Sequence, residues 1–274
     1  MPELPEVEIT VRGIAPHITG KKISTILVRN NRLRTTVRDD ISEIISQFTV
    51  KEVRRRAKYI LIILDIGILV IHLGMSGSLR ILTCQTLPEK HDHIDMVFDD
   101  GTVLRYRDPR RFGLFEWFNY EIENIPLFRS LGVEPLSSDF HADYLYSKIQ
   151  KRTMPIKQLL MNAQIIVGVG NIYANEVLFL SKINPKTVSG SLSYAQCETL
   201  VNHTINVLNQ SIKQGGSTLR DFTHSDGTHG YFQQSHLVYG RENQPCTHCN
   251  TPIKRTVIGQ RSTFFCPVCQ PEKS

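Results

Sequence analysis

Apolar residues near the N-terminus recur at the spacing of an amphipathic helix. Val7, Val11, Ile14 and Ile18 fall on one face, which predicts a helix over residues 3–18. Beyond position 22 the pattern changes to short runs typical of strands. Those runs cover 23–28, 50–56, 58–64, 68–73, 78–82, 93–99, 102–107 and 114–118, with one helix expected over 39–48. Turn signals at 65–67 and 99–101 join neighbouring runs, so the pattern predicts an antiparallel sandwich or barrel.

The strand pattern ends near residues 131–135, where we expect a domain boundary. Helical periodicity follows at 139–151, 155–162, 171–182 and 193–214. A polar, glycine-containing stretch at 217–240 is long for a loop inside a compact domain, and such loops are usually functional or disordered. The fold class predicted for the whole chain is therefore α+β.

Composition narrows the class of protein only modestly. The 274 residues are 41% hydrophobic, which is ordinary for a globular chain. Thirty-two Lys and Arg against 26 Asp and Glu give a net charge of +6, which raises the expectation of a polyanionic partner. The acidic start does not match a secretory signal, and the longest apolar stretch, 59–73, is interrupted by polar residues. We therefore expect a cytoplasmic protein without a membrane partner.

Four of the six cysteines form two C-x-x-C pairs near the C-terminus. They are Cys246, Cys249, Cys266 and Cys269, with sixteen residues between the pairs. Two such knuckles offer four thiolates to one tetrahedral Zn²⁺, and no further ligand type suggests an open coordination position. The stretch between them reads as strand, turn at 259–260 and strand. We predict one structural zinc ion in a β-hairpin finger.

Basic residues gather in two of the expected strand regions. The first group is Lys51, Arg54, Arg55, Arg56 and Lys58, and the second is Arg105, Arg107, Arg110 and Arg111. Both groups lie beside apolar strands, so their charges can project from one face and neutralise phosphates. A solvated sheet edge that discourages aggregation is an equally good interpretation.

Two apolar residues stand in turns next to arginines. Met75 lies in the turn 74–77, and Phe112 follows Arg110 and Arg111. An exposed apolar side chain beside cations can insert into a base stack, although core packing is the commoner fate of Met and Phe. Arg261, at the turn of the predicted zinc hairpin, has a similar pair of interpretations, as a phosphate ligand or a solvated tip.

The run Gly168-Val169-Gly170-Asn171 resembles a dinucleotide-binding fingerprint only superficially. Position 173 is Tyr where that motif needs a small residue, and no βαβ pattern surrounds it. We predict instead a tight turn with Asn171 as the N-cap of the next helix. Backbone amides at a helix N-terminus also suit a phosphate.

Pro2 follows the initiating Met1, whose removal would leave a free secondary amine. Such an amine can form a covalent iminium that keeps its positive charge and acts as an electron sink. Glu3 and Glu6 lie three residues apart, which can place their carboxylates near that amine. For an arbitrary chain with this start, a routine helix beginning is the commoner interpretation.

Taken together, these motifs resemble the bacterial formamidopyrimidine-DNA glycosylase family along nearly the whole chain. The matching segments are MPELPEVE at 1–8, RRAKY at 55–59, IHLGMSG at 71–77, KHDH at 90–93, DPRRFG at 108–113, VGVGNIYA at 167–174, VYGR at 238–241 and the terminal zinc finger. The resemblance implies an N-terminal helix with a β-sandwich over 1–134, a helix–two-turn–helix domain with a lesion-capping loop over 135–237, and a zinc finger over 238–274.

The resemblance also implies an activity and its catalytic residues. The family excises oxidised purines such as 8-oxoguanine and formamidopyrimidines from duplex DNA, flipping the damaged nucleotide out of the helix, and then cleaves the strand by β,δ-elimination. Pro2 would attack C1′ and Glu3 would protonate the sugar. Lys58 and Arg261 would assist at the flanking phosphates. Because an amide nitrogen is not nucleophilic, a chain that keeps Met1 would be inactive.

The remaining roles implied by the resemblance concern DNA contact. Met75, Arg110 and Phe112 would fill the space left by the flipped base. His72, His91, Arg152 and Asn171 complete the expected DNA-binding set. No nucleotide cofactor is implied, and the family precedent is a monomer acting at the bacterial nucleoid.

Three other functions compete with this interpretation. One is an endonuclease-VIII-like enzyme for oxidised pyrimidines, which the Met75, Arg110 and Phe112 set and the long loop disfavour. Another is a non-catalytic zinc-ribbon protein that binds DNA, and a third is a structural zinc protein without a DNA role. Ser76 stands where some relatives carry glutamate, so the lesion preference is open from the sequence alone.

Overall fold

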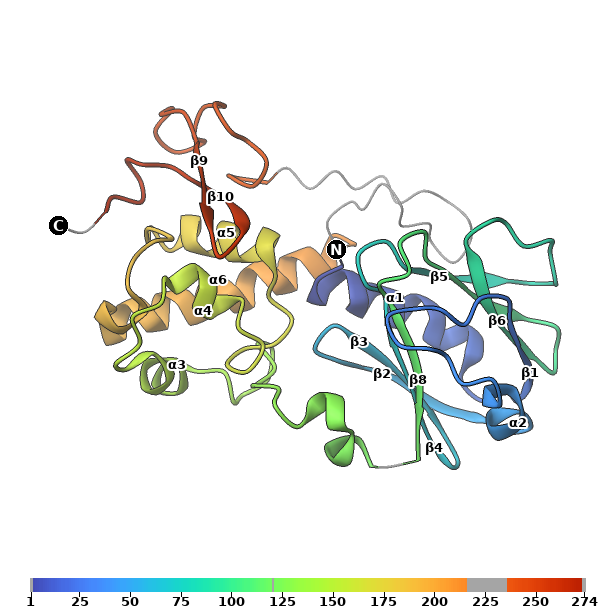
Figure 1. Cartoon of the computed structure of the whole chain (residues 1–274). Helices are drawn as coiled ribbons and strands as arrows, with labels where there is room; N and C mark the ends of the chain where they lie inside the picture. The colour runs from blue at the N-terminus through green and yellow to red at the C-terminus, as the bar shows by residue number, and fades with distance from the viewer. Residues whose placement is uncertain (1, 120, 216–235, 273–274) are drawn as a thin grey trace. The chain divides into compact units, whose positions relative to one another are not determined.

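The computed structural model describes residues 2–119, 121–215 and 236–272. The chain divides into two compact units, and the break between them falls after Arg129. Figure 1 follows the elements of each unit along the chain. The mixture of antiparallel sheets and separate helices confirms the predicted α+β class.

The first unit opens with α1 (Leu4–Ile18), one residue shorter than predicted. Val7, Val11, Ile14 and Ile18 are all buried, as their spacing requires. Glu3 is the N-cap of this helix and forms a capping box with Glu6. The helix therefore begins with its first amides satisfied by its own acidic side chains.

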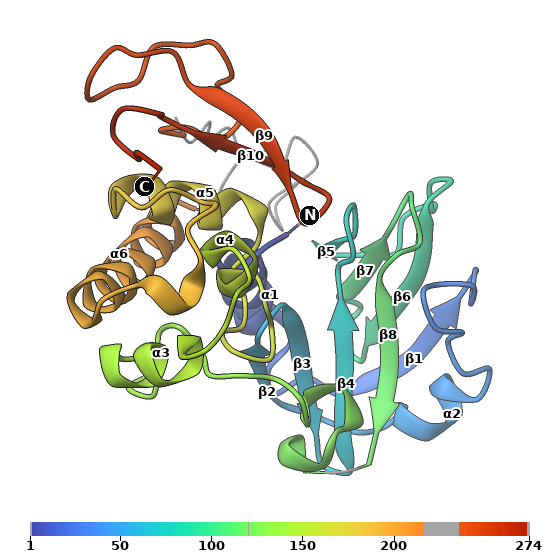
Figure 2. The ribbon, with the colours of Figure 1, turned by 60° about the vertical axis from the view of Figure 1, so that its left-hand side comes forward.

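Eight strands of the first unit form two four-stranded antiparallel sheets. One sheet has the order β1 (Ile23–Val28), β6 (Asp92–Phe98), β7 (Val103–Arg107) and β5 (Ser78–Leu82). The other has the order β2 (Val50–Arg56), β3 (Tyr59–Leu64), β4 (Gly67–His72) and β8 (Leu114–Phe118). Each strand lies within one residue of its predicted bounds. Because the sheets are separate, the sandwich alternative is confirmed over the barrel (Figure 2).

The core of this unit lies between the two sheets and beneath α1. That helix contacts β2 and β3 of one sheet and β5 of the other, so it lies against an edge strand of each sheet. Covering both edges protects them from pairing with another chain. It also fixes the N-terminus of the chain against the sandwich.

One predicted element of this unit is wrong in extent. The helix expected over 39–48 is the short α2 (Ile41–Ile45). Ser46 adopts an extended backbone with a ψ of 149°, which ends the helix, and Gln47 follows with a positive φ of 72°. Two 3₁₀ helices, η1 (Ile122–Asn124) and η2 (Pro126–Phe128), follow the sandwich and were not expected.

The second unit is built on four α-helices and a hairpin. The helices are α3 (Ala142–Ile149), α4 (Ile156–Leu160), α5 (Asn171–Leu180) and α6 (Tyr194–Lys213), with the 3₁₀ helix η3 (Ser189–Ser191) before α6. The long helix α6 contacts both α3 and α5. All four lie inside the predicted ranges; α3, α4 and α6 are shorter than predicted at both ends, and α5 at its C-terminal end only.

The hairpin of this unit, β9 (Lys254–Ile258) and β10 (Arg261–Phe265), packs on α5. Its two turn residues, Gly259 and Gln260, both have positive φ, as a tight two-residue hairpin turn requires. The turn lies where the sequence predicted it. Residues 217–235 of the predicted 217–240 loop lie outside the described residues. Within the part that the structure does describe, no helix has the length and apolarity needed to cross a bilayer.

Candidate catalytic and DNA-binding residues

The first predicted catalytic pair lies at the start of α1. Pro2 and Glu3 are both buried, directly before the first helical turn. The backbone amide of Glu3 donates a hydrogen bond of 2.8 Å to Oε2 of Glu6, which is also buried. The carboxylate of Glu6 therefore holds the main chain next to Pro2, so the expected grouping of acidic residues at the N-terminus is present.

Lys58 lies in the two-residue turn between β2 and β3. Its neighbour Ala57 has a positive φ of 54°, an unusual conformation for a residue with a side chain. Arg55 supports the turn by donating from Nη1 to the Ala57 carbonyl at 2.9 Å, and it also donates from Nε to Glu8 of α1 at 2.9 Å. Arg55 thereby ties the Lys58 turn to the helix that carries Pro2 and Glu3.

His72, at the end of β4, is a neutral group in this fold. Burial lowers its pKa to about 4, with further lowering from the positive charges of Arg34 and Lys58. Its Nδ1 accepts a hydrogen bond of 2.9 Å from the Gly74 amide, so this nitrogen carries no proton. The ring acts on the turn that follows it through this bond, not through a charge.

The two predicted wedge residues are exposed, unlike core residues. Met75 is 37% exposed and Phe112 is 50% exposed. The guanidinium carbon of Arg110 lies 4.7 Å from the centre of the Phe112 ring, within the range of a cation–π contact. The interpretation of Met75 and Phe112 as core residues is therefore wrong, and the three side chains project from two turns of one unit.

Beneath these turns lies Asp108, whose side chain is fully buried. Its carboxylate accepts hydrogen bonds from the Ser76 hydroxyl at 2.7 Å and from the Gly113 amide at 2.9 Å. The Arg110 amide and the Tyr106 hydroxyl also donate to it, each at 3.2 Å. The sequence interpretation quoted this residue only as part of a motif and gave it no role.

The two basic groups do not form the common phosphate-binding face that we considered from the sequence. They lie on strands of different sheets, and most of their charges meet acidic partners. Lys51 pairs with Asp65, Arg54 with Glu52, Arg55 with Glu8, Arg105 with Asp95 and Asp92, and Arg107 with Glu89 and Asp92. That expectation is wrong as stated, because carboxylates from paired strands, from the same strand, from α1 and from turns lie next to these cations. Arg110 and Arg111 are exposed.

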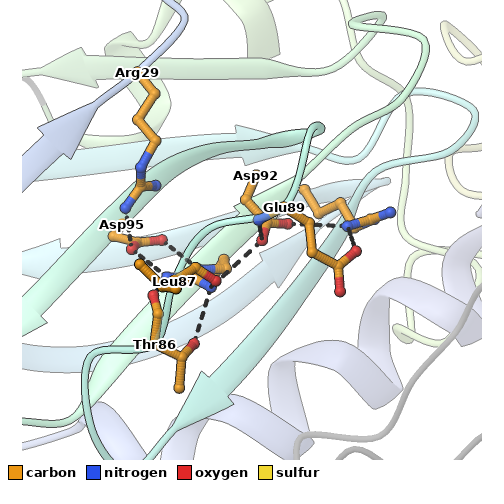
Figure 3. A network of polar contacts seen from close by, with 8 residues as sticks. Arg29, Thr86, Leu87, Glu89, Asp92 and Asp95 are labelled. Carbon is orange, nitrogen blue, oxygen red and sulfur yellow. Dashed lines mark hydrogen bonds and ion pairs between the residues drawn. The ribbon is translucent and has the colours of Figure 1, made fainter.

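Arg105 is the clearest example of this pairing. Only 4% exposed, it donates to both carboxylate oxygens of Asp95 and to the Thr86 carbonyl. Figure 3 shows the network around it, with Arg29 also bonded to Asp95 at 2.6 Å. Burial works to raise the pKa of Asp95, but the bonds from Arg105 and Arg29 outweigh it and leave that pKa below its usual range. This network is a buried structural element.

The same network fixes the segment that ends in His91. Asp92 accepts from the backbone amide of Glu89 at 2.8 Å, and the Glu89 carbonyl accepts from the amide of Asp92. The His91 carbonyl accepts from the Asp108 amide at 3.1 Å. His91 itself is half-buried, so its ring is partly accessible at the end of a firmly held loop.

In the second unit, the capping role predicted for Asn171 is wrong. Gly170 is the N-cap of α5, and Asn171 is the first helical residue. Its side-chain amide instead donates to the Ser262 carbonyl in β10 at 3.0 Å, while its Oδ1 is buried without a hydrogen-bond partner. The hairpin supplies a nearby acceptor, and the side chain turns to it instead of back to its own helix.

The hairpin that carries Arg261 is tied to the helices by several buried polar side chains. Lys157 of α4, fully buried, donates from Nζ to the Ser262 carbonyl at 2.9 Å and to the Thr263 hydroxyl at 2.7 Å. Asn175 of α5 accepts from the Phe264 amide at 2.7 Å. Arg261, exposed at the first position of β10, therefore stands on a rigid support.

Two further contacts complete the second unit. Arg152 is half-buried and donates from Nε to the Lys148 carbonyl at 2.6 Å, a bond that orients its guanidinium. The carboxylate of Glu176 in α5 accepts hydrogen bonds from the backbone amides of Leu237, Val238 and Tyr239 at 2.7–3.0 Å. Sequence reasoning missed Glu176 and Lys157, because nothing in their spacing indicates burial. Their position inside the helical ranges expected at 155–162 and 171–182 was the one available signal.

The four predicted zinc ligands form one cluster. Their Sγ atoms all lie within 4.8 Å of one another, with Cys249 at 3.4 Å from Cys266 and 3.5 Å from Cys269, and Cys246 at 3.9 Å from Cys269. These distances are far from a disulfide of about 2.05 Å. They match sulfurs placed tetrahedrally about a metal at about 2.3 Å, whose separation is about 3.8 Å.

The chemistry of this donor set also fits zinc. Hydrogen bonds from Thr251 lower the pKa of Cys249 to about 6, whereas burial raises the pKa of Cys266 and raises that of Cys269 to about 12. Four thiols this close resist joint ionisation unless a cation compensates them. Amides of His248 and Cys269 donate to cluster sulfurs at 3.4 Å. The positions and chemistry of the four sulfurs therefore fit one bound zinc ion.

Comparisons with known proteins agree with this geometry. Three family descriptions match the chain in order: the formamidopyrimidine-DNA glycosylase N-terminal domain over residues 1–115, the H2TH domain of the same family over 131–223, and the zinc finger found in FPG and IleRS over 243–271. The formamidopyrimidine-DNA glycosylase of Thioalkalivibrio sulfidiphilus is 52% identical over 270 residues, covering 98% of this chain and 100% of the relative.

Solved structures show the same likeness. A Lactococcus lactis FPG variant in complex with a Fapy-dG containing DNA matches with a TM-score of 0.91 and 34% identity, over 99% of this chain and all of the other. The Lactococcus lactis enzyme in complex with an abasic-site DNA matches with a TM-score of 0.90 and 34% identity, over 98% of this chain and all of the other. With relatives this similar along its full length, the chain belongs to the formamidopyrimidine-DNA glycosylase family.

Proposed function

We propose that this protein is a bifunctional DNA glycosylase and AP lyase that removes oxidised purines through a covalent intermediate on Pro2. The observation that carries the mechanism is the buried Pro2-Glu3 pair at the capped start of α1. Relatives bound to Fapy-dG and abasic-site DNA support the substrate class. Membership of the family supports the pairing of glycosylase and lyase activities.

Pro2 acts as the nucleophile once Met1 is absent. Its secondary amine attacks C1′, the bond to the base breaks with its electron pair leaving on the base, and Glu3 protonates the sugar ring oxygen as the ring opens. The iminium that results withdraws electrons from C2′, so a proton is lost there and the 3′-phosphate leaves. A second elimination releases the 5′-phosphate.

The remaining residues contact DNA in this proposal. Lys58, which is tied to α1 through Arg55, and Arg261, which stands on the braced hairpin, neutralise phosphates flanking the lesion. Met75, Arg110 and Phe112 enter the stack from their exposed turns. His72, His91, Arg152 and Asn171 hold the turns and the backbone. The zinc ion supplies folding free energy to the finger and takes no part in the chemistry.

We also propose the domain division 1–134, 135–237 and 238–274, action as a monomer, and a location at the bacterial nucleoid. The three matched family regions support this order of domains. The division between compact units after Arg129 supports a boundary near the first of these limits.

Borohydride trapping tests the mechanism. Pro2→Gly should keep lesion binding and lose most base excision, strand cleavage and trapped adduct on a duplex carrying 8-oxoguanine opposite cytosine. Pro5→Ala, in the same first turn, is the matched control and should trap normally. Glu3→Gln keeps an acceptor for the capping box, so it should fold and bind but fail to open the sugar.

Two of the three rival functions predict different results in these assays. A pure zinc-ribbon binder would be indifferent to Pro2→Gly, and an enzyme for oxidised pyrimidines would cleave an oxidised-pyrimidine duplex faster than the 8-oxoguanine duplex. Full excision by protein shown by mass to retain Met1 would exclude Pro2 as the nucleophile. Lys58 would then be the next candidate.

A further inference from the structure

The turns that carry Met75 and Phe112 touch through their backbones. Gly74 has a φ of +60°, and a Cβ added there would lie 2.5 Å from the carbonyl carbon of Phe112 and 2.6 Å from the amide nitrogen of Gly113. No side chain fits in that space. The two turns are therefore in direct contact, and displacement of one must be felt by the other.

Asp108 supplies the polar connection between them. One carboxylate oxygen accepts from the Ser76 hydroxyl of the first turn and from the Arg110 amide of the second. The other accepts from the Gly113 amide and from the Tyr106 hydroxyl beneath. A single buried carboxylate is thus bonded to both turns and to the sheet that supports them.

The donors to this carboxylate are neutral dipoles. Burial and the neighbouring Asp108 charge raise the pKa of Tyr106, so its hydroxyl keeps the proton that it donates. Hydrogen bonds to a charged acceptor are roughly twice as strong as neutral ones, and they are directional. A carboxylate held this way fixes the positions of its donors, and therefore of the turns that contain them.

We propose that Asp108 is a positioning residue that joins the turns of Met75 and of Arg110 and Phe112 into one rigid wedge. The inference rests on the proposed function, in which these side chains enter the base stack. It assigns Ser76 a role as well: its hydroxyl is directed to Asp108, so it locks the first turn. The role of Ser76 in this protein is therefore to keep the turn that carries Met75 rigid.

The test compares two substrates that differ in how much a wedge is needed. The first is a duplex with 8-oxoguanine opposite cytosine and 2-aminopurine beside the lesion. The second has a missing base opposite the lesion, so no pair has to be broken. Because extruding a paired base costs a few kcal/mol, Asp108→Asn should slow excision from the paired duplex about tenfold or more.

On the second substrate the same variant should stay within about threefold of the unaltered protein, because less unpairing energy is required. The 2-aminopurine fluorescence rise that reports opening of the stack should slow in parallel on the paired duplex. Asn keeps one acceptor oxygen and turns an NH₂ toward an amide donor, so the change loosens the turns with little change in volume. Ser76→Ala removes the bond that the hydroxyl donates to Asp108 and the one that it accepts from the Arg110 amide at 3.2 Å, but it leaves the carboxylate in place, so it should show the same pattern more weakly.

Asp95→Asn is the matched control for destabilisation alone. Asp95 is a similarly buried carboxylate in β6, which pairs with the strand that leads to Asp108, and among the described residues its side chain bonds only to Arg105 and Arg29, which lie in neither turn. It should lower the melting temperature and leave the ratio of the two excision rates unchanged. An altered ratio in Asp95→Asn as large as that in Asp108→Asn would overturn the proposal.

Other outcomes would overturn it too. If Asp108→Asn slows excision equally on both substrates, Asp108 acts in folding or in chemistry. If it slows excision on neither substrate, Asp108 does not position the wedge. If Asp108→Asn does not fold, Ser76→Ala decides by the same ratio. Phe112→Ala distinguishes the wedge itself from its positioning by Asp108. If Phe112→Ala changes the ratio of the two excision rates and the Asp108 and Ser76 variants do not, the wedge stands and its positioning by Asp108 is refuted. If Phe112→Ala does not change the ratio, both the wedge and this inference are refuted.

Discussion

The guanidinium of Arg105 holds the carboxylate of Asp95 by two parallel hydrogen bonds, Nε to Oδ1 and Nη2 to Oδ2, each 2.8 Å long. The two residues are direct cross-strand partners in β7 and β6. A paired fork of this kind is among the strongest polar contacts a protein makes. Here it lies inside the sheet layer of the first unit, and it also holds the chain at Thr86.

Removing this guanidinium should therefore destabilise the fold. Arg105→Met leaves the buried carboxylate of Asp95 with Arg29 as its remaining cation, and breaking a buried pair costs about 3–5 kcal/mol. Urea denaturation should show that loss in the free energy of unfolding. Lys51→Met breaks the exposed pair with Asp65 and should cost about 1 kcal/mol or less. Equal costs for the two variants would contradict the structural role of Arg105.

His72 should make stability depend on pH in a defined window. Its pKa is about 4 in the folded protein against 6.5 for an ordinary histidine. Between these values the unfolded chain binds more protons, so the free energy of unfolding falls as the pH drops from about 6.5 toward 4. Above that window this group has no effect on the pH dependence.

His72→Asn isolates the effect, because its amide oxygen can still accept from the Gly74 amide while the side chain cannot titrate. The melting temperature of the unaltered protein should drop more between pH 7.5 and pH 5 than that of the variant. Parallel pH profiles would show that His72 is not held neutral.

Loss of one cysteine from the cluster should release the zinc ion. Cys249→Ser removes a thiolate that lies 3.4 Å from one partner sulfur and 3.5 Å from another. Structural zinc contributes on the order of 10 kcal/mol in small finger peptides, so the hairpin should unfold and DNA binding should weaken. Elemental analysis measures the metal. Cys84→Ser, at an exposed cysteine outside the cluster, should retain one equivalent, and active protein without zinc would contradict the site.

DNA binding should weaken steeply with salt, but only some of the basic residues should contribute. If six phosphates are neutralised, affinity falls by roughly a thousandfold between 50 and 200 mM salt. Arg152→Gln should reduce the slope by about one, because its bond is to a neutral carbonyl. Arg54→Gln should leave the slope unchanged, because Glu52 already compensates that charge. Equal slopes for both variants would mean that local pairing does not decide which cations reach DNA.

The elements of the fold could be predicted closely because their periodicity is strong. Short apolar runs and the turn at 99–101 predicted the bounds of β6 and β7 to within one residue. The two C-x-x-C pairs predicted the β9–β10 hairpin in the stretch that separates them. The short η1 and η2 were missed because three-residue helices leave no periodic pattern. The helix predicted over 39–48 was too long because the change to an extended backbone at Ser46 leaves no mark in hydrophobic spacing.

Charge was harder to interpret than hydrophobicity. The sequence shows that Arg105 and Arg107 are basic, but their meaning depends on which residues lie opposite them. The turn at 99–101 contained the information needed. Folding the chain back at that turn pairs Asp95 with Arg105 and Asp92 with Arg107 across the two strands. Asp108 was overlooked for a related reason, since a lone acid among arginines gives no indication that it is buried and multiply bonded.

Phe112 offers the sharpest distinction between packing and DNA insertion. Half of its surface is exposed, and Arg110 covers one face of the ring. Truncating a fully buried phenylalanine costs about 3–5 kcal/mol, whereas this ring has little core packing to lose. Phe112→Ala should therefore melt within a few degrees of the unaltered protein, and yet excise a paired lesion much more slowly, because the wedge offsets a few kcal/mol of unstacking. Single-turnover excision and thermal melting measure the two effects on one preparation. Leu104→Ala, in the core of the same unit, gives the opposite reference: a large loss of stability. If Phe112→Ala melts as early as Leu104→Ala, the ring is packing and not a wedge.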